Sequence, residues 1–247
     1  MRQWLKRLFD ICFPRYCVVC GSRLRYAETC TCVRCLLNLP LTRFKGRRSN
    51  VVERILWDER IATQRANAFL KFDRLSPYCQ IFYHFKYWSH PQVAVYYGRL
   101  MALDVRDEGF FEGIDLIVPV PLSRRRLGRR GYNQSERIAQ GIRQVTGLPV
   151  QEGVVVRCVD NRTQTRLTAE ERRQNVADIF RLARPEAVCG KHVLLVDDVI
   201  TTGSTLRACA HALLEAGDVR LSVMGLAVSS YHMRWVFPEP CEAAQGQ

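Results

Sequence analysis

Two adjacent carboxylates followed by a hydroxyl-rich turn form the most informative pattern in this chain of 247 residues. Asp197 and Asp198 come directly after the apolar run at 193–196. The turn that follows contains Thr201, Thr202, Gly203, Ser204 and Thr205. Its hydroxyl groups can donate hydrogen bonds to phosphate oxygens, and its glycine lets the backbone approach them closely. The two acids would repel a phosphate, so they must face something else, such as sugar hydroxyls or a metal ion.

The elements around this pattern predict that it lies at one edge of a parallel sheet. The four apolar residues suit a strand buried on both faces, because the run is short and β-branched. A helical run follows at 206–214. In an open parallel sheet, ligands bind beyond the carboxyl ends of the strands, where a helix amino terminus favours an anion. The sequence therefore predicts an α/β fold with a phosphate site between this strand and this helix.

A second segment that could bind a ligand is the basic stretch after the predicted strand at 116–120. Five of the seven residues at 124–130 are arginine. Asn133 and Glu136 form a capping box for a helix that is predicted to run to about residue 145. A basic loop between a strand and a capped helix can neutralise pyrophosphate, and the alternative is a plain solvated loop. The residues predicted to form this pyrophosphate loop are Ser123, Arg124, Arg125, Arg130 and Asn133.

The remaining pattern predicts the elements that hold these two loops. Helices are predicted at 51–57, 76–87 and 91–106, and strands at 65–72, 154–156 and 221–228. The polar stretch at 162–168 has no apolar periodicity, which predicts a mobile lid over the site or, as the alternative, a plain surface loop. The residues predicted to form this flexible loop are Arg162, Gln164, Thr165 and Arg166.

Cysteines concentrate near the amino terminus, where six of the eleven fall between Cys12 and Cys35. Two CxxC pairs can place four thiolates around one metal ion. The predicted ligands are Cys17, Cys20, Cys32 and Cys35, with Cys30 as an alternative to Cys32. A closed set of four sulfurs indicates a structural Zn²⁺ site. A disulfide framework is the competing interpretation, but no secretion signal accompanies the cysteines.

The composition favours a phosphorylated partner. The formal net charge is +13, and 32 of the 37 basic residues are arginine. Arginine meets phosphate oxygens two at a time, whereas lysine acts as a point charge; a general arginine bias of the genome is the alternative explanation. No apolar run approaches the roughly 20 residues that span a membrane. The amino terminus alternates charged and apolar residues, which predicts a soluble, cytoplasmic protein without a signal peptide.

Residues 193–205 resemble, position by position, the motif with which type I phosphoribosyltransferases bind 5-phosphoribosyl-1-pyrophosphate (PRPP). The chain as a whole, from about residue 17 to 228, is similar to the ComF family of bacterial phosphoribosyltransferase-like proteins. The further segments that carry this resemblance are the two CxxC pairs, 84–87, 119–122, 130–135, 164–165, and Arg172 with Asn175. The resemblance implies a type I phosphoribosyltransferase fold, with a parallel sheet flanked by helices and a small four-cysteine zinc ribbon at the amino terminus.

The resemblance also implies a role for each part of the site. Asp197 and Asp198 would be the catalytic pair that holds the ribose 2- and 3-hydroxyls, and residues 201–205 would bind the 5-phosphate. Mg²⁺ would accompany PRPP and bridge its pyrophosphate and ribose oxygens. The family is associated with DNA uptake during competence, which implies the competence helicase or other uptake proteins as partners.

Three functions are compatible with the sequence. The first is a phosphoribosyltransferase that transfers a pentosyl group, although no residue is an obvious general base for the acceptor. The second is a competence factor that binds single-stranded DNA through arginines and the aromatic residues Phe82, Phe85, Tyr87 and Trp88. The third is a PRPP-sensing regulator without turnover. The predicted organisation is a helix and zinc ribbon at 1–40, a basic linker at 41–65, a phosphoribosyltransferase-like domain at 66–238 and a frayed tail at 239–247.

Overall fold

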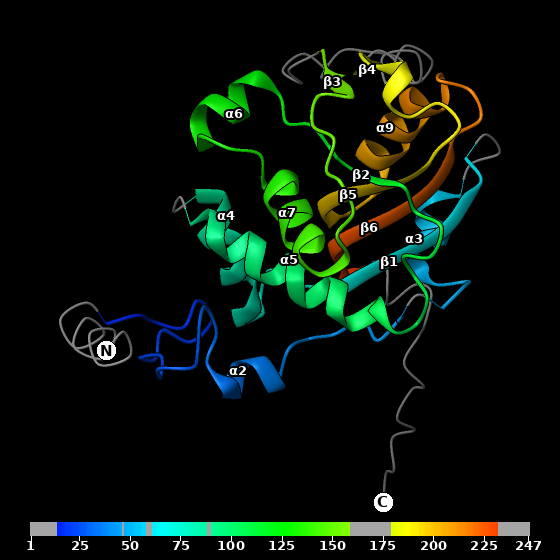
Figure 1. Cartoon of the computed structure of the whole chain (residues 1–247). Helices are drawn as coiled ribbons and strands as arrows, with labels where there is room; N and C mark the ends of the chain where they lie inside the picture. Colours follow the sequence, from blue (N-terminus) through cyan, green and yellow to red (C-terminus); the bar gives the residue numbers. More distant parts are fainter. Residues whose placement is uncertain (1–13, 46, 58–60, 88–89, 159–178, 232–247) are drawn as a thin grey trace, which may run out of the picture.

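A parallel sheet forms the centre of the computed structural model, which describes residues 14–45, 47–57, 61–87, 90–158 and 179–231 (Figure 1). Its four strands lie in the order β1–β6–β5–β2, and β3 pairs with β4 in a separate antiparallel ladder. Their bounds are β1 (Thr63–Phe72), β2 (Leu116–Pro119), β3 (Val155–Arg157), β4 (Phe180–Leu182), β5 (His192–Ile200) and β6 (Arg220–Ser229). Because β2 and β5 are parallel neighbours, the segments that follow them start from the same edge of the sheet.

Helices cover both faces of this sheet (Figure 1). One face carries α4 (Gln80–Tyr87), α5 (Pro91–Arg106) and α7 (Gln134–Thr146), and the other carries α3 (Val51–Leu56) and α9 (Ser204–Leu214). Successive residues of β5 alternate between two cores: Leu194 and Val196 join the core that contains α5 and α7, whereas Leu195 joins the core that contains α9. A strand buried on both faces accounts for the uninterrupted apolar run in the sequence. The predicted fold class is confirmed.

The two helices α5 and α7 approach each other closely because each presents a glycine to the other's backbone. A Cβ atom at Gly98 would lie 2.3 Å from the carbonyl oxygen of Ile138, and one at Gly141 would lie 2.2 Å from that of Val95. Neither position can accept a larger side chain without separating the helices. This contact fixes the place of α7, which packs against β2 and β5.

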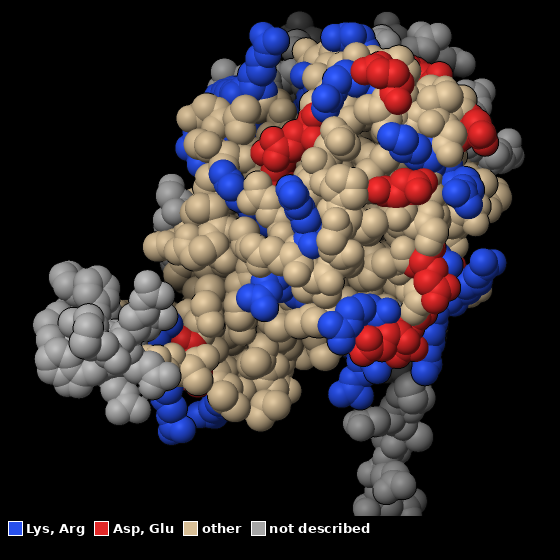
Figure 2. Space-filling model, in the orientation of Figure 1, with Lys and Arg blue, Asp and Glu red and all other residues tan. Residues whose placement is uncertain are grey.

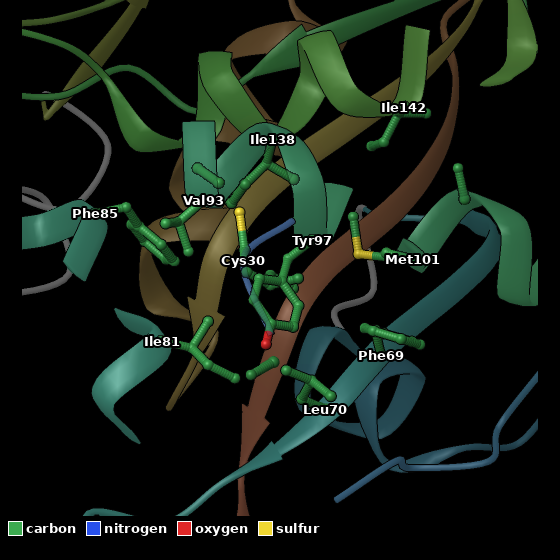
Figure 3. Packing of buried hydrophobic residues seen from close by; sticks show 14 of the residues in the cluster. Cys30, Phe69, Leu70, Ile81, Phe85, Val93, Tyr97, Met101, Ile138 and Ile142 are labelled. Atoms are coloured by element: carbon green, nitrogen blue, oxygen red, sulfur yellow. The ribbon is translucent and has the colours of Figure 1, made fainter. Parts of the chain in front are cut away.

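The amino-terminal ribbon (residues 14–37, which include α2 at Val33–Leu37) packs against α5. The hydroxyl oxygens of Thr31 and Tyr97 are 2.6 Å apart, and both side chains are buried. Figure 3 shows Cys30 beside Tyr97, in the same core as Val93 and Ile138. The ribbon therefore shares a hydrophobic core with the helices of the main domain.

Part of the predicted basic linker packs against the sheet. Asn50 caps α3 by accepting hydrogen bonds from the N–H groups of Val52 and Glu53. Its amide also donates to the carbonyl of Ala66 in β1, at 2.7 Å. Val51 and Val52 are fully buried. The helix predicted at 51–57 is thus present, and it covers one face of the sheet.

The stretch predicted as a basic loop after β2 instead contains the helix α6 (Arg124–Arg130). Ser123 caps this helix by accepting a hydrogen bond from the N–H of Arg126, and Gly131 ends it in the left-handed conformation at φ 74°. Both capping residues can be found in the sequence. The helix was nevertheless missed, because its seven residues include no buried one and so show no apolar periodicity.

The other predicted elements of the described chain are present, with shifts at their ends. The helix predicted at 91–106 has those bounds in α5, whereas β5 continues through both acids to Ile200. Short 3-10 turns lie at Pro77–Cys79 and Pro185–Ala187. The predicted amino-terminal helix, the segment predicted as a flexible loop and the segment predicted as a frayed tail lie outside the described residues. None of the described helices has both the length and the apolar character needed to cross a bilayer.

Candidate functional site

The acidic pair lies at the carboxyl end of β5, as predicted, and both side chains are only partly exposed. The carboxylate of Asp197 accepts a hydrogen bond from the Ser135 hydroxyl at 3.2 Å and one from the backbone N–H of Asp198 at 2.8 Å. Ser135 comes from the first turn of α7, where Asn133 caps the helix. The start of α7 therefore orients one of the two acids.

The Asp197 carboxyl has an unusual proton affinity. Burial raises its pKa to about 7, and the negative charge of Asp198 acts in the same direction. The Asp198 N–H, the Lys86 ammonium and the Ser135 hydroxyl oppose this rise in pKa. Near neutral pH, the protonated and ionised forms of the Asp197 carboxyl are therefore similar in free energy.

Asp198 faces a basic residue for which the sequence predicts no role. The Lys86 Nζ lies 2.7 Å from the Asp198 Oδ2, and both side chains are less than one fifth exposed, at 19% and 17%. Lys86 is near the end of α4, in the segment 84–87. The lysine residue is thus 112 positions from its partner in the sequence, and no spacing rule could have joined the two.

Because the pKa of Asp197 is raised in the folded protein, ionisation of this acid should lower the stability of the fold as the pH rises. The folded-state pKa of about 7 exceeds the ordinary aspartate pKa of 3.8. Between these two pH values the folded protein binds more protons than the unfolded chain, so stability falls as the pH rises. Asp197→Asn should remove this loss. We expect the variant to melt at a higher temperature than the wild type at pH 8, with the difference shrinking towards pH 5.

Thermal unfolding of both proteins at several pH values would check this expectation. Asp107→Asn provides the matched control, because Asp107 is exposed on the surface. A difference in melting temperature that stays constant from pH 5 to 8 would contradict the assigned pKa shift.

The hydroxyl-rich turn lies directly between β5 and α9. Gly203 adopts a left-handed conformation at φ 72° and caps α9, while Thr201, Thr202 and Ser204 are exposed. In the described part of the chain, the backbone N–H groups of Gly203 and Thr205 donate to no protein acceptor. The turn thus offers an anion free N–H groups, exposed hydroxyls and the amino end of an 11-residue helix.

The back of this turn rests on α3. A Cβ atom at Gly203 would lie 2.5 Å from the Ile55 side chain, so the turn can approach α3 only with glycine here. The Arg207 guanidinium donates to the carbonyl of Ile55, which ties α9 to α3. The described part of the predicted linker thus supports the hydroxyl-rich turn.

The predicted pyrophosphate residues divide into two groups. Ser123, Arg124 and Asn133 line a cavity of about 550 Å³ between α6, α7 and the β3–β4 pair. Arg157 and Arg181 join them from the other side, and basic side chains also lie over α6 in Figure 2. Two residues are placed elsewhere: Arg125 is exposed outside this cavity, and Arg130 donates to the Gln134 side chain at 2.7 Å.

Two of the aromatic residues predicted to stack on single-stranded DNA are buried in the structure. Phe82 and Phe85 are only 4% and 0% exposed, because they pack in the core beneath α4. Neither can stack on a nucleic-acid base. Tyr87 is 59% exposed, with Arg130 5.7 Å above its ring centre. Trp88 and the predicted flexible-loop residues Arg162, Gln164, Thr165 and Arg166 lie outside the described residues.

The four predicted metal ligands converge in the ribbon. The sulfur atoms of Cys17, Cys20, Cys32 and Cys35 all lie within 4.8 Å of one another. The Cys20 and Cys32 Sγ atoms are 3.8 Å apart, which matches the edge of about 3.8 Å for a tetrahedron with Zn–S bonds of about 2.3 Å. The backbone N–H of Cys32 donates to the Cys17 Sγ at 3.4 Å. Cys30, in contrast, is buried in the core outside this cluster.

Comparison with known proteins identifies related sequences and a domain. The phosphoribosyl transferase domain model matches residues 130–236. Competence protein F from Haemophilus influenzae is 32% identical over 219 residues, which cover 87% of this chain and 85% of that protein. DNA utilization protein YhgH from Escherichia coli is 34% identical over 154 residues, which cover 61% of this chain and 67% of that protein. The solved glutamine PRPP amidotransferase from B. subtilis is 25% identical, with a TM-score of 0.39, over 57% of this chain and 30% of that chain.

Proposed function

Because the chain belongs to the ComF family, we propose that it binds PRPP, or a related ribose 5-phosphate ligand, together with Mg²⁺ in the course of DNA uptake. One observation carries this proposal: the acidic pair and a turn with free N–H groups lie at the carboxyl end of the same strand, β5. A sugar with adjacent hydroxyls and a 5-phosphate matches both parts. The hydroxyls can donate to carboxylates while the phosphate accepts from the turn.

Different residues of the site bind different parts of the ligand. Asp197 and Asp198 accept hydrogen bonds from the ribose 2- and 3-hydroxyls. The 5-phosphate accepts from the N–H groups of Gly203 and Thr205, with the exposed hydroxyls of Thr201, Thr202 and Ser204 around it. The pyrophosphate extends towards the cavity lined by Ser123, Arg124 and Asn133.

Both carboxylates of the site already have protein partners, so a magnesium ion would arrive with the ligand and be held mainly by the ligand's phosphate oxygens. Mg²⁺ retains much of its water and is bound mainly through substrate phosphates with one or two carboxylates. Asp198 is already paired with Lys86, and Asp197 already accepts two hydrogen bonds. When bound, the ion would neutralise pyrophosphate and template the ligand. The protein's own part is to fix the ribose and the 5-phosphate.

The ribbon supports a second proposal, a structural Zn²⁺ held by Cys17, Cys20, Cys32 and Cys35. The close sulfur cluster and the N–H donor to the Cys17 Sγ favour thiolate ligands. Four protein sulfurs leave no open position for a substrate, so the ion would stabilise the ribbon rather than take part in chemistry.

Thermal unfolding with PRPP and Mg²⁺ tests the proposed ligand. Since a ligand that binds only the folded state raises stability with its concentration, we expect PRPP with Mg²⁺ to raise the melting temperature of the wild type. The variant Asp197→Asn/Asp198→Asn should lose this rise, because amides donate as well as accept and carry no charge. Asp107→Asn/Glu108→Gln is the matched control, because both acids are exposed.

An unchanged melting temperature of the wild type at millimolar PRPP and Mg²⁺ would reject the PRPP site. Release of pyrophosphate in the presence of a panel of bases and amines would distinguish a transferase from a protein that only senses PRPP. The result of this second assay does not alter the test of binding.

A further inference from the structure

We propose that Lys86 is a positioning residue of the ribose site, and that its ammonium is the built-in cation that holds the acidic pair ready for sugar hydroxyls. The proposal rests on the proposed function for the identity of the sugar. It goes beyond that function by assigning a role to α4, which precedes the matched phosphoribosyl transferase domain in the chain.

Lys86 is held at the site by α4, and buried contacts fix the position of this helix. Phe85, its neighbour in α4, is fully buried, and its backbone carbonyl accepts a hydrogen bond from the Tyr132 hydroxyl. Tyr132 is also buried and stands just before the start of α7. One short connection therefore links the helix that carries Lys86 to the helix that carries Ser135. The two side chains that contact the acidic pair are positioned together.

The ion pair with Asp198 is sheltered enough to matter energetically. Exposed ion pairs contribute little because water screens them, but both members of this pair are about four fifths buried. Removing one member of a sheltered pair leaves the other without its charged partner. Without Lys86, Asp198 would therefore lose its fixed orientation, and the ribose would have to bind a mobile acceptor.

Lys86 also acts on the second acid. Asp197 is influenced by charged and polar groups from three elements: Asp198 in β5, Lys86 in α4 and Ser135 in α7, while Cys209 of α9 is close enough to be influenced by its charge. Of these, Asp198 favours protonation of Asp197 and Lys86 opposes it. The lysine therefore helps to keep both acids available as acceptors for sugar hydroxyls.

The chain contains a matched control for a lysine substitution. Lys191 is an exposed lysine directly before β5, at the end of the strand opposite the acidic pair. Lys86→Met keeps the length of the side chain and removes its charge, and Lys191→Met makes the same chemical change away from the site. Lys86→Arg retains the charge.

The first measurement uses the ligand-free protein and carbon-13-labelled aspartate. In an NMR titration, we expect Lys86→Met to raise the midpoint of the Asp197 carboxyl, with Lys86→Arg closer to the wild type and Lys191→Met unchanged. An unchanged midpoint in Lys86→Met would overturn the proposal, because the ammonium would then not neutralise the pair.

The second measurement uses calorimetry with PRPP and Mg²⁺, and separately with ribose 5-phosphate. We expect Lys86→Met to weaken both ligands by about tenfold or more, as the loss of a sheltered charged partner predicts. Lys86→Met should weaken binding less in the Asp198→Asn background than in the wild type, because the lysine acts mainly through its ion pair with Asp198. Weakening of PRPP but not of ribose 5-phosphate would identify a direct pyrophosphate contact and would overturn the positioning role. If the wild type bound neither ligand, the proposed function would fail, while the NMR titration would still decide whether Lys86 neutralises the acids.

Discussion

Cys35→Ser is expected to release the zinc proposed for the ribbon and to cause a large loss of stability in the main domain as well as in the ribbon. The proposed site has four thiolate ligands. Replacing one of them by a hydroxyl removes a ligand, and among the described residues the sulfur cluster contains no fifth sulfur to take its place. Structural zinc contributes about 10–16 kcal/mol in isolated zinc-finger peptides. The ribbon is too short to fold by burial of apolar surface alone. The proposed metal would therefore supply most of the folding free energy of the ribbon.

The effect should extend beyond the ribbon because the two parts share one core. Val18, Leu24 and Cys30 are buried in the same cluster as Tyr97 of α5. An unfolded ribbon would expose this surface and remove the partner of the Tyr97 hydroxyl. We therefore expect a lower melting temperature of the whole protein, in addition to the loss of about one equivalent of zinc.

Zinc content by mass spectrometry and thermal unfolding by circular dichroism would check this result. Cys189→Ser is the control, since Cys189 is exposed and stands outside the sulfur cluster. A wild type that contains no metal and no free thiols would instead support disulfides. Full zinc content in Cys35→Ser would contradict the assignment of this ligand.

Gly141→Ala is expected to destabilise the fold by about 3 kcal/mol or more, because the added methyl group meets backbone atoms. The new Cβ would lie 2.2 Å from the Val95 carbonyl oxygen and 2.8 Å from the Arg99 nitrogen. Backbone atoms cannot rotate away as a side chain can, so α7 must move off α5. Equilibrium unfolding in urea would measure the change in the free energy of unfolding.

Gly128→Ala is the matched control for this substitution. Gly128 is also helical, in α6, and its added Cβ would have no neighbour within 4 Å. Alanine favours a helix over glycine by about 0.5–1 kcal/mol, so the control should be neutral or slightly stabilising. A free energy of unfolding for Gly141→Ala within roughly 0.5 kcal/mol of the wild type, the range of ordinary surface substitutions, would show that the helices are not closely packed.

The strand, turn and helix around the acidic pair could be predicted because local sequence determines them. The apolar run, the glycine and the Asn133 capping box each act over a few residues. The predictions were poorer where a segment depends on distant partners. The polar composition of residues 41–65 predicted a linker and hid the packing of α3, whose Val51 and Val52 are buried in a core that they share with β1 and α9.

The sequence could indicate which residue types form the site but not which of them meet. Lys86 and Ser135 contact the acidic pair through tertiary packing, and neither contact has a spacing signature. Arg130 belongs to the basic run that predicted a pyrophosphate loop, yet it pairs with Gln134 because α6 orients it away from the cavity. A run of like residues does not show which member faces the ligand, since that depends on the helix formed.

The order of the strands constrains how the protein can be made. β6 lies between β1 and β5, and Ala66 of β1 pairs with Val223 of β6 across 157 positions. During translation, β1 emerges long before its partner, and pairing between such distant segments is slow. The ribbon and α5 are complete by residue 106, so they can associate early. The sheet that presents the acidic pair can close only when β6 has left the ribosome, and until then β1 and β5 each expose an unpaired edge to chaperones or to aggregation.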